Sequence, residues 1–389
     1  MKPVQVLHVI ASIDSSYGGP AVALEGLCGK LQTRTSRFGL LTCSSGMPLH
    51  DRENQNRFPN ADLIWSKPLV RRYCWDPFLD SALRNQLNKF NVIHVHGVFN
   101  GLVSGVCRAA RREKIPYILE PFGTLSDYCL NKNLWLKKIS LGLFERKNIE
   151  SATLVRFSSE QEKSTALKNF NIRNSIVLGH GIDNKGFDRL PMRGNLRKKL
   201  GLGDEDKLIL FLGRLQPIKG LEVFLPAFLQ WQRTRRERWF FAIAGPDEQG
   251  YQKKLEKILR ETQDKRAFLT GPLFDEAKLE AFSDADIFCL PSLHENFGIA
   301  AAEAAACRKP ILISNQTGVA QAVRDFHLGI VVAPTINGFM NGLEKMANRQ
   351  DEWLAMGERG RAWVESNCQW GTIADVLMDE YMKMIKCSP

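Results

Sequence analysis

The chain has 389 residues, enough for two or three domains with buried cores, and its 44% apolar and 24% charged residues exclude a disordered or fibrous protein. Its formal net charge is +11, and residues 1–190 hold 26 Lys and Arg against 16 Asp and Glu, whereas residues 191–389 hold 27 against 26. A basic half favours an anionic partner such as a membrane surface, a phosphorylated lipid or a nucleic acid, although an ordinary solubilising surface has the same composition.

The start of the chain and its cysteines predict a location. The first residues, MKPVQVLHVIA, carry no signal-peptide pattern and predict a first strand. No uncharged apolar run approaches the roughly 18 residues that span a bilayer. The nine cysteines form no C-x-x-C pair and several lie in apolar runs, which indicates a reducing compartment. We therefore expect a cytoplasmic protein whose membrane contact, if it has any, is peripheral and at the inner face of the cell membrane.

Apolar runs without polar alternation recur through the chain and predict strands that are buried on both faces. In the first half they cover residues 4–11, 38–43, 91–98, 116–121 and 152–159. In the second half they cover residues 207–213, 239–245, 267–271, 285–291 and 309–314. Helical patterns such as those at 21–34 and 220–234 separate the runs, and this alternation favours parallel sheets covered by helices.

A predicted connecting loop divides the chain: residues 179–195 are rich in Gly, Asp and Asn and predict a domain boundary. We predict an α/β fold of two Rossmann-like, doubly wound parallel-sheet domains at residues 1–180 and 181–370. In such domains the ligand loops follow the carboxyl ends of the strands. We therefore expect a ligand cleft where the two domains face each other.

The first half offers two candidate binding positions at strand ends. Gly18 and Gly19 form a glycine loop before a helix, which suits either a close ligand or a tight turn. The loop is not a G-x-G-x-x-G fingerprint, so we expect no dinucleotide cofactor. His96 closes the strand at 91–98 and is placed to bond a sugar hydroxyl or carry a proton, although a core histidine is the alternative. His94 is expected in the core, and with no third ligand at metal-site spacing we predict no metal.

The stretch ILFLGRLQPIKG, residues 209–220, places Arg214 and Lys219 on the loop after a predicted strand. Two cations beside the start of a helix form an anion site that suits a pyrophosphate. Taken alone, the pair also fits two solvated surface charges.

The stretch LPSLHENFGIAAAEAAAC, residues 290–307, predicts a strand end, a loop and a helix of high helix propensity. Glu295 lies in the loop and Glu303 about one and a half turns into the helix, so both reach one edge of the sheet. Carboxylates accept hydrogen bonds from vicinal diols, and backbone N–H groups at a helix start suit phosphate or hydroxyl oxygens. The residues that would supply these N–H groups are Asn296, Phe297, Gly298 and Ile299. The combination predicts a nucleotide-sugar site, although each glutamate alone fits a solvated position.

In this order, the GGP loop, VIHVHG, FLGRLQPIKG, AIAGPDEQGY and LPSLHENFGIAAAEAAA resemble the retaining glycosyltransferases of family four, which have the GT-B fold. The resemblance spans nearly the whole chain. It implies transfer of a sugar from a nucleotide diphosphate sugar, with a UDP-sugar favoured, to a glycan or lipid-linked acceptor in surface polysaccharide or glycolipid synthesis. It also implies that residues 371–389 form a helix that packs back on the first domain.

The resemblance implies roles for the charged candidates. Glu303 is expected to hold the donor ribose, and Glu295 with the backbone of 296–299 to hold the transferred sugar. Arg214 and Lys219 are expected to neutralise the pyrophosphate and to stabilise the charge that develops on the leaving group.

The resemblance extends to the remaining candidates. His96 is expected to touch the donor sugar, Gly19 to let the first domain close on the donor, and Leu273 to seat the base. The family's reaction uses no metal or cofactor, because the leaving phosphate takes the acceptor's proton on the same face and the anomeric configuration is kept. This chain departs from the family pattern at two positions: His180 stands in the linker where asparagine is usual, and Arg308 where glycine is usual.

Residues 132–147 mix large apolar side chains, among them Trp135, Leu136, Ile139, Leu143 and Phe144, with five Lys and Arg. The segment predicts either a surface that lies on an anionic membrane and presents a lipid-linked acceptor, or an ordinary amphipathic helix packed on its sheet.

Two other functions fit parts of the sequence. A nucleotide-sugar epimerase on the same fold would turn over the donor without an acceptor. A nucleic-acid-binding module would use the basic half and bind with steep salt dependence. The strands lack interleaved aromatic and basic residues, so we expect no nucleic acid partner.

Overall fold

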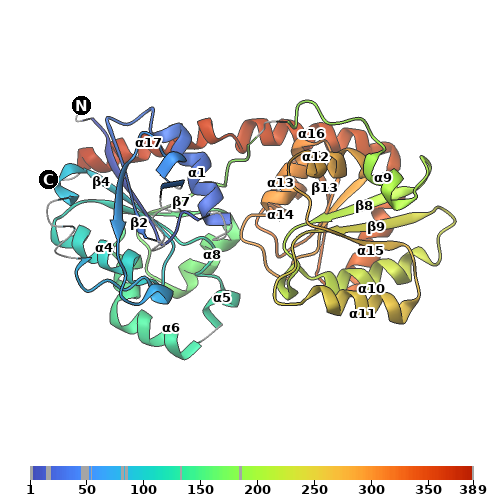
Figure 1. The fold of residues 1–389 in the computed structure, drawn as a ribbon, viewed down its shortest axis with the longest axis horizontal. Coiled ribbons are helices and arrows are strands. Elements are labelled where there is room, and N and C mark those ends of the chain that lie inside the picture. Colours follow the sequence, from blue (N-terminus) through green and yellow to red (C-terminus); the bar gives the residue numbers. More distant parts are fainter. Residues whose placement is uncertain are drawn as a thin grey trace. The chain divides into compact units, whose positions relative to one another are not determined.

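The chain divides into two compact units in the structure, a computed structural model. Unit 1 consists of Met1–Gly181 and Gln369–Pro389, and unit 2 of Ile182–Cys368 (Figure 1). The structure describes residues 3–14, 19–44, 52–53, 55–79, 83, 86–131, 134–183 and 186–387.

Unit 1 is built on a sheet of seven parallel strands. In chain order these are β1 (Gln5–Ile10), β2 (Arg37–Cys43), β3 (Asp62–Ser66), β4 (Val92–His96), β5 (Tyr117–Glu120), β6 (Leu154–Phe157) and β7 (Ser175–Val177). They lie in the order β3-β2-β1-β4-β5-β6-β7. The order reverses between β1 and β4, so the loops after these two strands diverge and leave a crevice at the carboxyl edge of the sheet.

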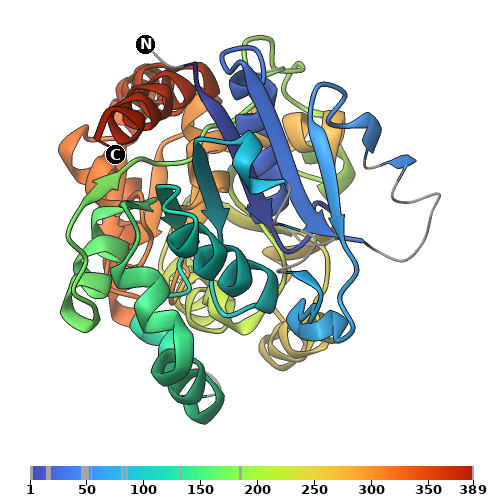
Figure 2. The ribbon, with the colours of Figure 1, turned by 90° about the vertical axis from the view of Figure 1, so that its left-hand side faces the viewer.

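Helices cover both faces of this sheet. They are α1 (Gly19–Leu31), η2 (Arg71–Tyr73), η3 (Leu87–Lys89), α4 (Gly101–Arg112), α5 (Asp127–Asn131), α6 (Leu134–Ser140), the π-helical turn η4 (Leu141–Glu145), α7 (Arg146–Glu150), α8 (Glu160–Asn169) and α17 (Trp370–Cys387). The apolar sides of α1 and α17 share one core with one face of the sheet. Those of α4, α7 and α8 share a second core with the opposite face. Figure 2 shows α17, in dark red, running beside the strands of unit 1.

Unit 2 repeats this plan with six parallel strands. They are β8 (Lys207–Leu212), β9 (Trp239–Ala244), β10 (Ala267–Gly271), β11 (Ile287–Leu290), β12 (Ile311–Ser314) and β13 (Gly329–Val332). Their order is β10-β9-β8-β11-β12-β13, with the reversal between β8 and β11. The two sheets confirm the predicted α/β class with doubly wound parallel sheets.

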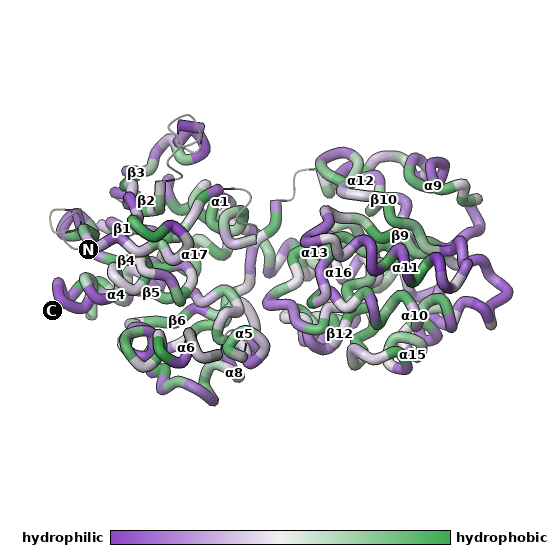
Figure 3. Tube along the Cα trace, turned by 60° about the horizontal axis from the view of Figure 1, so that its bottom comes forward, coloured by the Kyte–Doolittle hydropathy of each residue, from purple (hydrophilic) through white to green (hydrophobic). Residues whose placement is uncertain are grey.

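The helices of unit 2 enclose one continuous core on both faces of its sheet. They are α9 (Asn195–Leu200), η5 (Pro217–Lys219), α10 (Leu221–Gln232), α11 (Gln252–Thr262), α12 (Asp275–Asp284), α13 (Ile299–Ala306), α14 (Ala320–Asp325), α15 (Ile336–Ala347), η6 (Gln350–Glu352) and α16 (Trp353–Asn367). In Figure 3 the strands are mostly drawn as hydrophobic and the outer turns as hydrophilic. None of the described helices combines the length and the apolarity needed to span a bilayer.

The indole ring of Trp370, at the start of α17, lies against two glycines of unit 1. A Cβ atom on Gly26 of α1 would lie 2.3 Å from the indole nitrogen, and one on Gly181 would lie 2.3 Å from the ring carbons. Further along α17, Leu377 and Tyr381 are fully buried. Because real Cβ contacts are never this short, only glycine at position 26 leaves room for the indole ring, and α17 can therefore pack against α1.

We predict that Gly26→Ala lowers the free energy of unfolding by about 1–3 kcal/mol, because the rigid indole must move to admit the methyl group. Gly29→Ala in the same helix is the matched control, since a Cβ there meets no atom within 4 Å. It should raise stability by up to about 1 kcal/mol, as alanine favours the helix. Chemical denaturation of both variants measures the difference, and equal midpoints would contradict the packing of Trp370.

Candidate functional site

In unit 2 the loops after β8 and β11 meet at the switch point of the sheet. The N–H of Leu293 donates to the carbonyl of Ile218 at 2.8 Å. A Cβ on Gly220, whose φ is 71°, would lie 2.1 Å from the carbonyl oxygen of Pro291. Only glycine allows this approach, so the sequence Lys219-Gly220 brings a cation to the loop that carries Glu295.

Lys219 and Glu295 form an ion pair across this switch point. The Nζ of Lys219 donates to Oε2 of Glu295, and the two side chains are 16% and 20% exposed. Arg214 points elsewhere: it is 52% exposed and bonds Glu248, in the loop after β9, at 2.6 Å. The structure therefore joins Lys219 to Glu295 and gives Arg214 a partner that the sequence did not indicate.

The loop before α13 is held by the loop after β12. The N–H of Glu295 donates to the carbonyl of Gln316, and the N–H of Gly318 donates to the carbonyl of Glu295, each at 2.9 Å. A Cβ on Gly318 would lie 2.0 Å from the carbonyl oxygen of Asn296, so the two loops touch through backbone alone. Gly298, with φ 103°, then turns the chain into α13 at Ile299. The first backbone N–H groups of such a helix have no partner within it and can bind an anion.

Glu303 lies in the second turn of α13 and is bonded to a lysine of α12. The Nζ of Lys278 donates to Oε1 of Glu303 at 2.7 Å, and the side chains are 25% and 16% exposed. Lys278 also lies 5.8 Å above the ring of Phe187. The carboxyl edge of this sheet thus carries two lysine–carboxylate pairs, each partly open to solvent.

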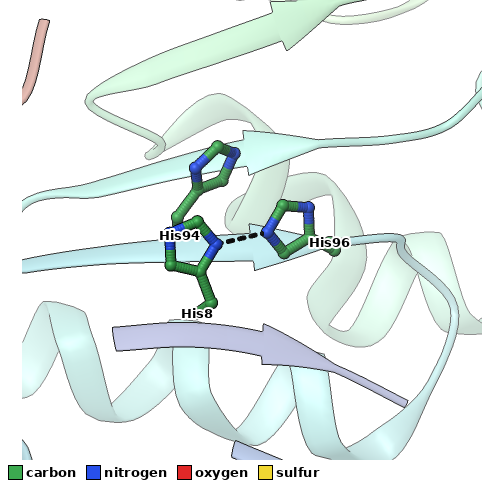
Figure 4. A group of neighbouring side chains, drawn as sticks. All are labelled: His8, His94 and His96. Atoms are coloured by element: carbon green, nitrogen blue, oxygen red, sulfur yellow. Dashed lines mark hydrogen bonds between the residues drawn. The ribbon is translucent and has the colours of Figure 1, made fainter. Parts of the chain in front are cut away.

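In unit 1 the switch point between β1 and β4 holds three stacked histidines, shown in Figure 4. His8 of β1 pairs in register with His94 of β4, and all three rings, including that of His96, are buried. Nδ1 of His8 and Nε2 of His96 are 2.9 Å apart. Ring centroids lie 4.3 Å apart for His94 and His96, and 5.1 Å for His8 and His96. Nδ1 of His94 lies 2.7 Å from the hydroxyl of Tyr381 on α17.

A buried carboxylate orders this stack. Glu120 at the end of β5 accepts from Nη1 of Arg156 at 2.9 Å and lies 3.1 Å from Nδ1 of His96. Burial alone would raise the pKa of Glu120, but the Arg156 guanidinium, the hydrogen bond from His96 and the ring of His94, whose Nε2 lies 3.6 Å away, lower it well below its usual range. An ionised Glu120 accepts a hydrogen bond from Nδ1–H of His96, so Nε2 of His96 accepts a hydrogen bond from Nδ1–H of His8.

Burial keeps the neighbouring histidines neutral. It is the largest cause that lowers the pKa of His94 to about 3 and that of His180 to about 4, with the charge of Arg156 acting in the same direction. The ring of His180 stacks on Phe122 with centroids 5.6 Å apart.

The same three histidines are a group that could ligate a metal ion, since one nitrogen from each lies within 4.8 Å of the others. Sequence spacing indicated only His94 and His96, and the register of β1 adds His8. The ring of His96 stacks on those of His8 and His94 with interplanar angles of 17° and 21°, whereas the rings of His8 and His94 are tilted by 37°. The 2.9 Å hydrogen bond between Nδ1 of His8 and Nε2 of His96 uses one nitrogen of each ring, so these two atoms cannot both ligate a metal while it is made. The geometry is that of a hydrogen-bonded stack.

Comparison with known families covers most of the chain. Residues 17–185 match Glycosyltransferase Family 4, and residues 192–363 match Glycosyl transferases group 1. The chain is a family 4 glycosyltransferase with the GT-B fold. This family assignment agrees with the transferase resemblance and favours it over the epimerase and nucleic-acid alternatives.

Relatives and solved structures support the assignment. The glycosyltransferase is 24% identical over 326 residues to the D-inositol 3-phosphate glycosyltransferase of Nocardia farcinica, covering 78% of this chain and 70% of that protein. Its fold is similar to that of Anabaena HepE, solved with UDP and glucose, with a TM-score of 0.75, 15% identity and coverage of 98% and 100%. Sucrose-phosphate synthase from Thermosynechococcus elongatus has a TM-score of 0.75 at 18% identity, with coverage of 99% and 100%.

The remaining predicted residues of the glycosyltransferase do not belong to the ion pairs or to the histidine stack. Gly18 lies outside the described residues, and Gly19 is the first residue of α1. Leu273 follows β10 and is partly buried. Arg308, which stands where glycine is usual, adopts the left-handed φ of 56° that glycine favours and bonds Glu358 at 2.9 Å.

Several residues of these clusters were not predicted. They are His8, Glu120, Arg156, Glu248, Lys278 and Tyr381. Each lies on a different element from the residue it contacts, so no local spacing links them. For His8 and Glu120 a signal did exist: polar residues stand inside the apolar runs VQVLHVIA and PYILEP, where a buried polar group needs a partner.

We predict that the glycosyltransferase loses stability as pH falls below about 6.5, by about 1 kcal/mol per pH unit for each buried neutral histidine. The unfolded chain binds protons that folded His94 and His180, with pKa values of about 3 and 4, do not bind. This contribution is complete above the unfolded pKa and is lost as pH falls toward the folded values. His94→Asn should flatten the dependence between pH 6.5 and 4, as measured by denaturation midpoints.

His327→Asn is the matched control for this prediction. His327 is exposed, and its φ of 51° is one that asparagine tolerates. It should leave the pH dependence unchanged, and an unaltered slope in His94→Asn would contradict the titration of the stack.

Proposed function

We propose that this glycosyltransferase moves a sugar from a nucleotide diphosphate sugar, with a UDP-sugar favoured, to a glycan or lipid-linked acceptor with retention of the anomeric configuration. The observation that carries this is the carboxyl edge of unit 2, where the pairs Lys219–Glu295 and Lys278–Glu303 flank the start of α13. A nucleotide diphosphate sugar has a pyrophosphate between a ribose and a sugar. Cations and backbone N–H groups can bind the pyrophosphate, and carboxylates can accept hydrogen bonds from the hydroxyls of the ribose and the sugar.

In the proposed donor binding, Lys219 and Arg214 exchange their carboxylate partners for the pyrophosphate of the donor. A pyrophosphate competes with Glu295 for Lys219 and with Glu248 for Arg214, and the exposed fractions of these side chains leave both accessible. Each charge-assisted hydrogen bond to the phosphates contributes about 1.5–3 kcal/mol. Glu295, released from Lys219, then accepts hydrogen bonds from the transferred sugar.

The remaining donor contacts follow the same edge. Glu303 accepts from the ribose hydroxyls, and the backbone N–H groups of 296–299 bond sugar or phosphate oxygens. Leu273, after β10, is proposed to seat the base. Support for uracil comes from Anabaena HepE, a protein of similar fold that was solved with UDP and glucose.

The proposed reaction exchanges two bonds at the anomeric carbon. The acceptor oxygen bonds this carbon as the bond to the leaving phosphate oxygen breaks, and that phosphate takes the acceptor's proton on the same face. Lys219 and Arg214 stabilise the charge that builds on the leaving diphosphate, which is the largest kind of contribution in such sites.

The acceptor is assigned to unit 1, whose carboxyl edge carries His96. The excess of 26 basic over 16 acidic residues in 1–190 suits an anionic acceptor. The relative from Nocardia farcinica is named for a phosphorylated compound, D-inositol 3-phosphate. A role in surface polysaccharide or glycolipid synthesis on the cytoplasmic side of the membrane fits this chemistry.

We predict that UDP-sugars raise the melting temperature more than GDP- or ADP-sugars at equal concentration, because ligand binding to the folded state stabilises it by mass action. The panel is read by thermal shift. Incubation with a UDP-sugar and a lipid-linked acceptor, followed by NMR of the anomeric proton, tests retention. An inverted product would refute retention, and stabilisation by none of the nucleotide sugars would refute the donor class.

We predict that Glu303→Gln weakens donor binding at least tenfold, since it removes the charge from the hydrogen bonds to the ribose. Lys278→Met is the matched control, because it breaks the same ion pair but leaves the carboxylate. It should weaken binding much less. Titration calorimetry with the best donor of the panel measures both, and equal losses would assign Glu303 a structural role.

A further inference from the structure

Unit 1 has an apolar groove of about 470 Å³ beside the carboxyl end of β4. Three segments line it: the turn around η2, the loop between β4 and α4, and the segment from α6 to the π-helical turn. The apolar side chains that form its walls are Val70, Tyr73, Trp75, Phe99, Ile139 and Phe144. Its volume lies within the range of about 300–1,000 Å³ that is typical of small-molecule sites.

Contacts between the three segments hold the groove open in a defined shape. Phe99 has a φ of 61°, a conformation unfavourable to a bulky residue, and its N–H donates to Oε1 of Glu145 at 3.2 Å. The buried Glu145 also accepts from the hydroxyl of Ser104 on α4 and so ties the π-helical turn to the loop after β4. A Cβ on Gly101 would lie 2.9 Å from Cα of Trp75, so glycine lets the start of α4 touch the turn around η2.

The groove belongs to an unusually exposed apolar area. Leu69 and Leu143, which neighbour lining residues in the sequence, are 73% and 71% exposed, and Trp135 is 67% exposed. Residues 132–147 were predicted either to lie on an anionic membrane and present a lipid-linked acceptor or to pack as an amphipathic helix on the sheet. The exposure of Trp135, Ile139 and Leu143 shows that these three side chains are not packed on the sheet. In Figure 3 the tube at α6 alternates between hydrophilic and hydrophobic residues.

Cations accompany these apolar walls. Residues 70–75 and 134–147 contain six Lys and Arg, and their one acidic residue, Glu145, is buried. Among the six, Arg71, Lys138, Arg146 and Lys147 are exposed. A ligand for this area therefore combines a hydrocarbon chain with an anionic head group.

We propose that the groove seats the hydrocarbon chain of a lipid phosphate acceptor and holds its head group at the carboxyl edge of unit 1. This rests on the proposed function and names the acceptor class. A concave seat lined by Trp75, Phe99 and Phe144 suits one discrete chain, whereas a membrane surface needs no groove. The groove adjoins the end of β4, so a seated chain brings its phosphate to the edge that carries His96.

The test measures binding of hexyl, octyl and decyl phosphate to the full chain by titration calorimetry, below the concentrations at which these amphiphiles form micelles. Inorganic phosphate is the chainless control. Each methylene buried in the groove should increase affinity about fourfold, equivalent to about 0.8 kcal/mol. Affinity that is independent of chain length would overturn the proposal.

Ile139→Asn and Leu143→Asn form the matched pair of variants. Both side chains are exposed, at 52% and 71%, so neither substitution threatens the fold, but only Ile139 lines the groove. We predict that Ile139→Asn lowers decyl phosphate affinity at least fivefold and that Leu143→Asn leaves it within twofold. Equal effects of the two variants would overturn the groove as the site.

Sedimentation with phosphatidylcholine vesicles, with and without phosphatidylglycerol, separates a chain seat from a membrane surface. Binding to the anionic vesicles without binding to any alkyl phosphate overturns the chain seat. Thermal stabilisation by a UDP-sugar, measured on the same variants, keeps the two proposals apart. If the protein binds the UDP-sugar but no alkyl phosphate, the proposed acceptor groove is refuted and the donor site stands. If it binds alkyl phosphates but no UDP-sugar, the proposed donor site is refuted and the groove stands.

Discussion

The reversal of strand order beside the first strand of each sheet is the constraint on which the chemistry of this glycosyltransferase depends. Between β1 and β4, and again between β8 and β11, neighbouring parallel strands send their following loops in opposite directions. Helices cover the faces of both sheets, so functional side chains collect at these two edges. In unit 2 the edge joins Lys219 to Glu295, and in unit 1 it stacks His8 on His96.

The two edges differ in how firmly their charges are paired. Glu120 and Arg156 are 2% and 1% exposed, and breaking such a buried pair costs about 3–5 kcal/mol. Lys219 and Glu295 are 16% and 20% exposed, so water and ligands can compete for them. Solvent-exposed ion pairs contribute only about 0–1 kcal/mol and fully buried pairs are costlier to break, so the partly buried Lys219–Glu295 pair lies between these limits and is more easily exchanged for a diphosphate than Glu120–Arg156. Unit 1 thus holds a fixed polar scaffold, and unit 2 holds charges suited to exchange.

The end of β4 links two features of unit 1. His96 joins the histidine stack, and Phe99, three residues later, forms a wall of the apolar groove. Glu145 fixes Phe99 in its strained conformation, so one buried carboxylate shapes the groove while another, Glu120, orders the stack. One oxygen of each carboxylate is bonded by groups from other elements, Oε2 of Glu120 by His96 and Arg156 and Oε1 of Glu145 by Phe99 and Ser104, which is how a parallel sheet can carry polar residues so near its core.

An element or a site residue could be predicted from the sequence when its signal lay within one short segment of the chain. The central strands follow from uninterrupted apolar runs, and the doubly wound class follows from their alternation with helices. The edge strands β3, β7 and β13 escaped prediction because they are short and only partly buried, which weakens the apolar signal. Arg214, Lys219 and Glu295 stood out because they lie in loops that follow predicted strands, and Glu303 because it is the one charge in an alanine-rich helix.

The sequence by itself therefore determined the fold class, the family resemblance and the motif residues, because those depend on the order of residues along one segment. Only the tertiary structure decided which residues meet. It paired Lys278 with Glu303, sent Arg214 to Glu248, and set His8 beside His94 through strand register. It also assembled the apolar groove from three segments of unit 1. Contacts between distant elements arise from packing, and no spacing along the chain encodes them.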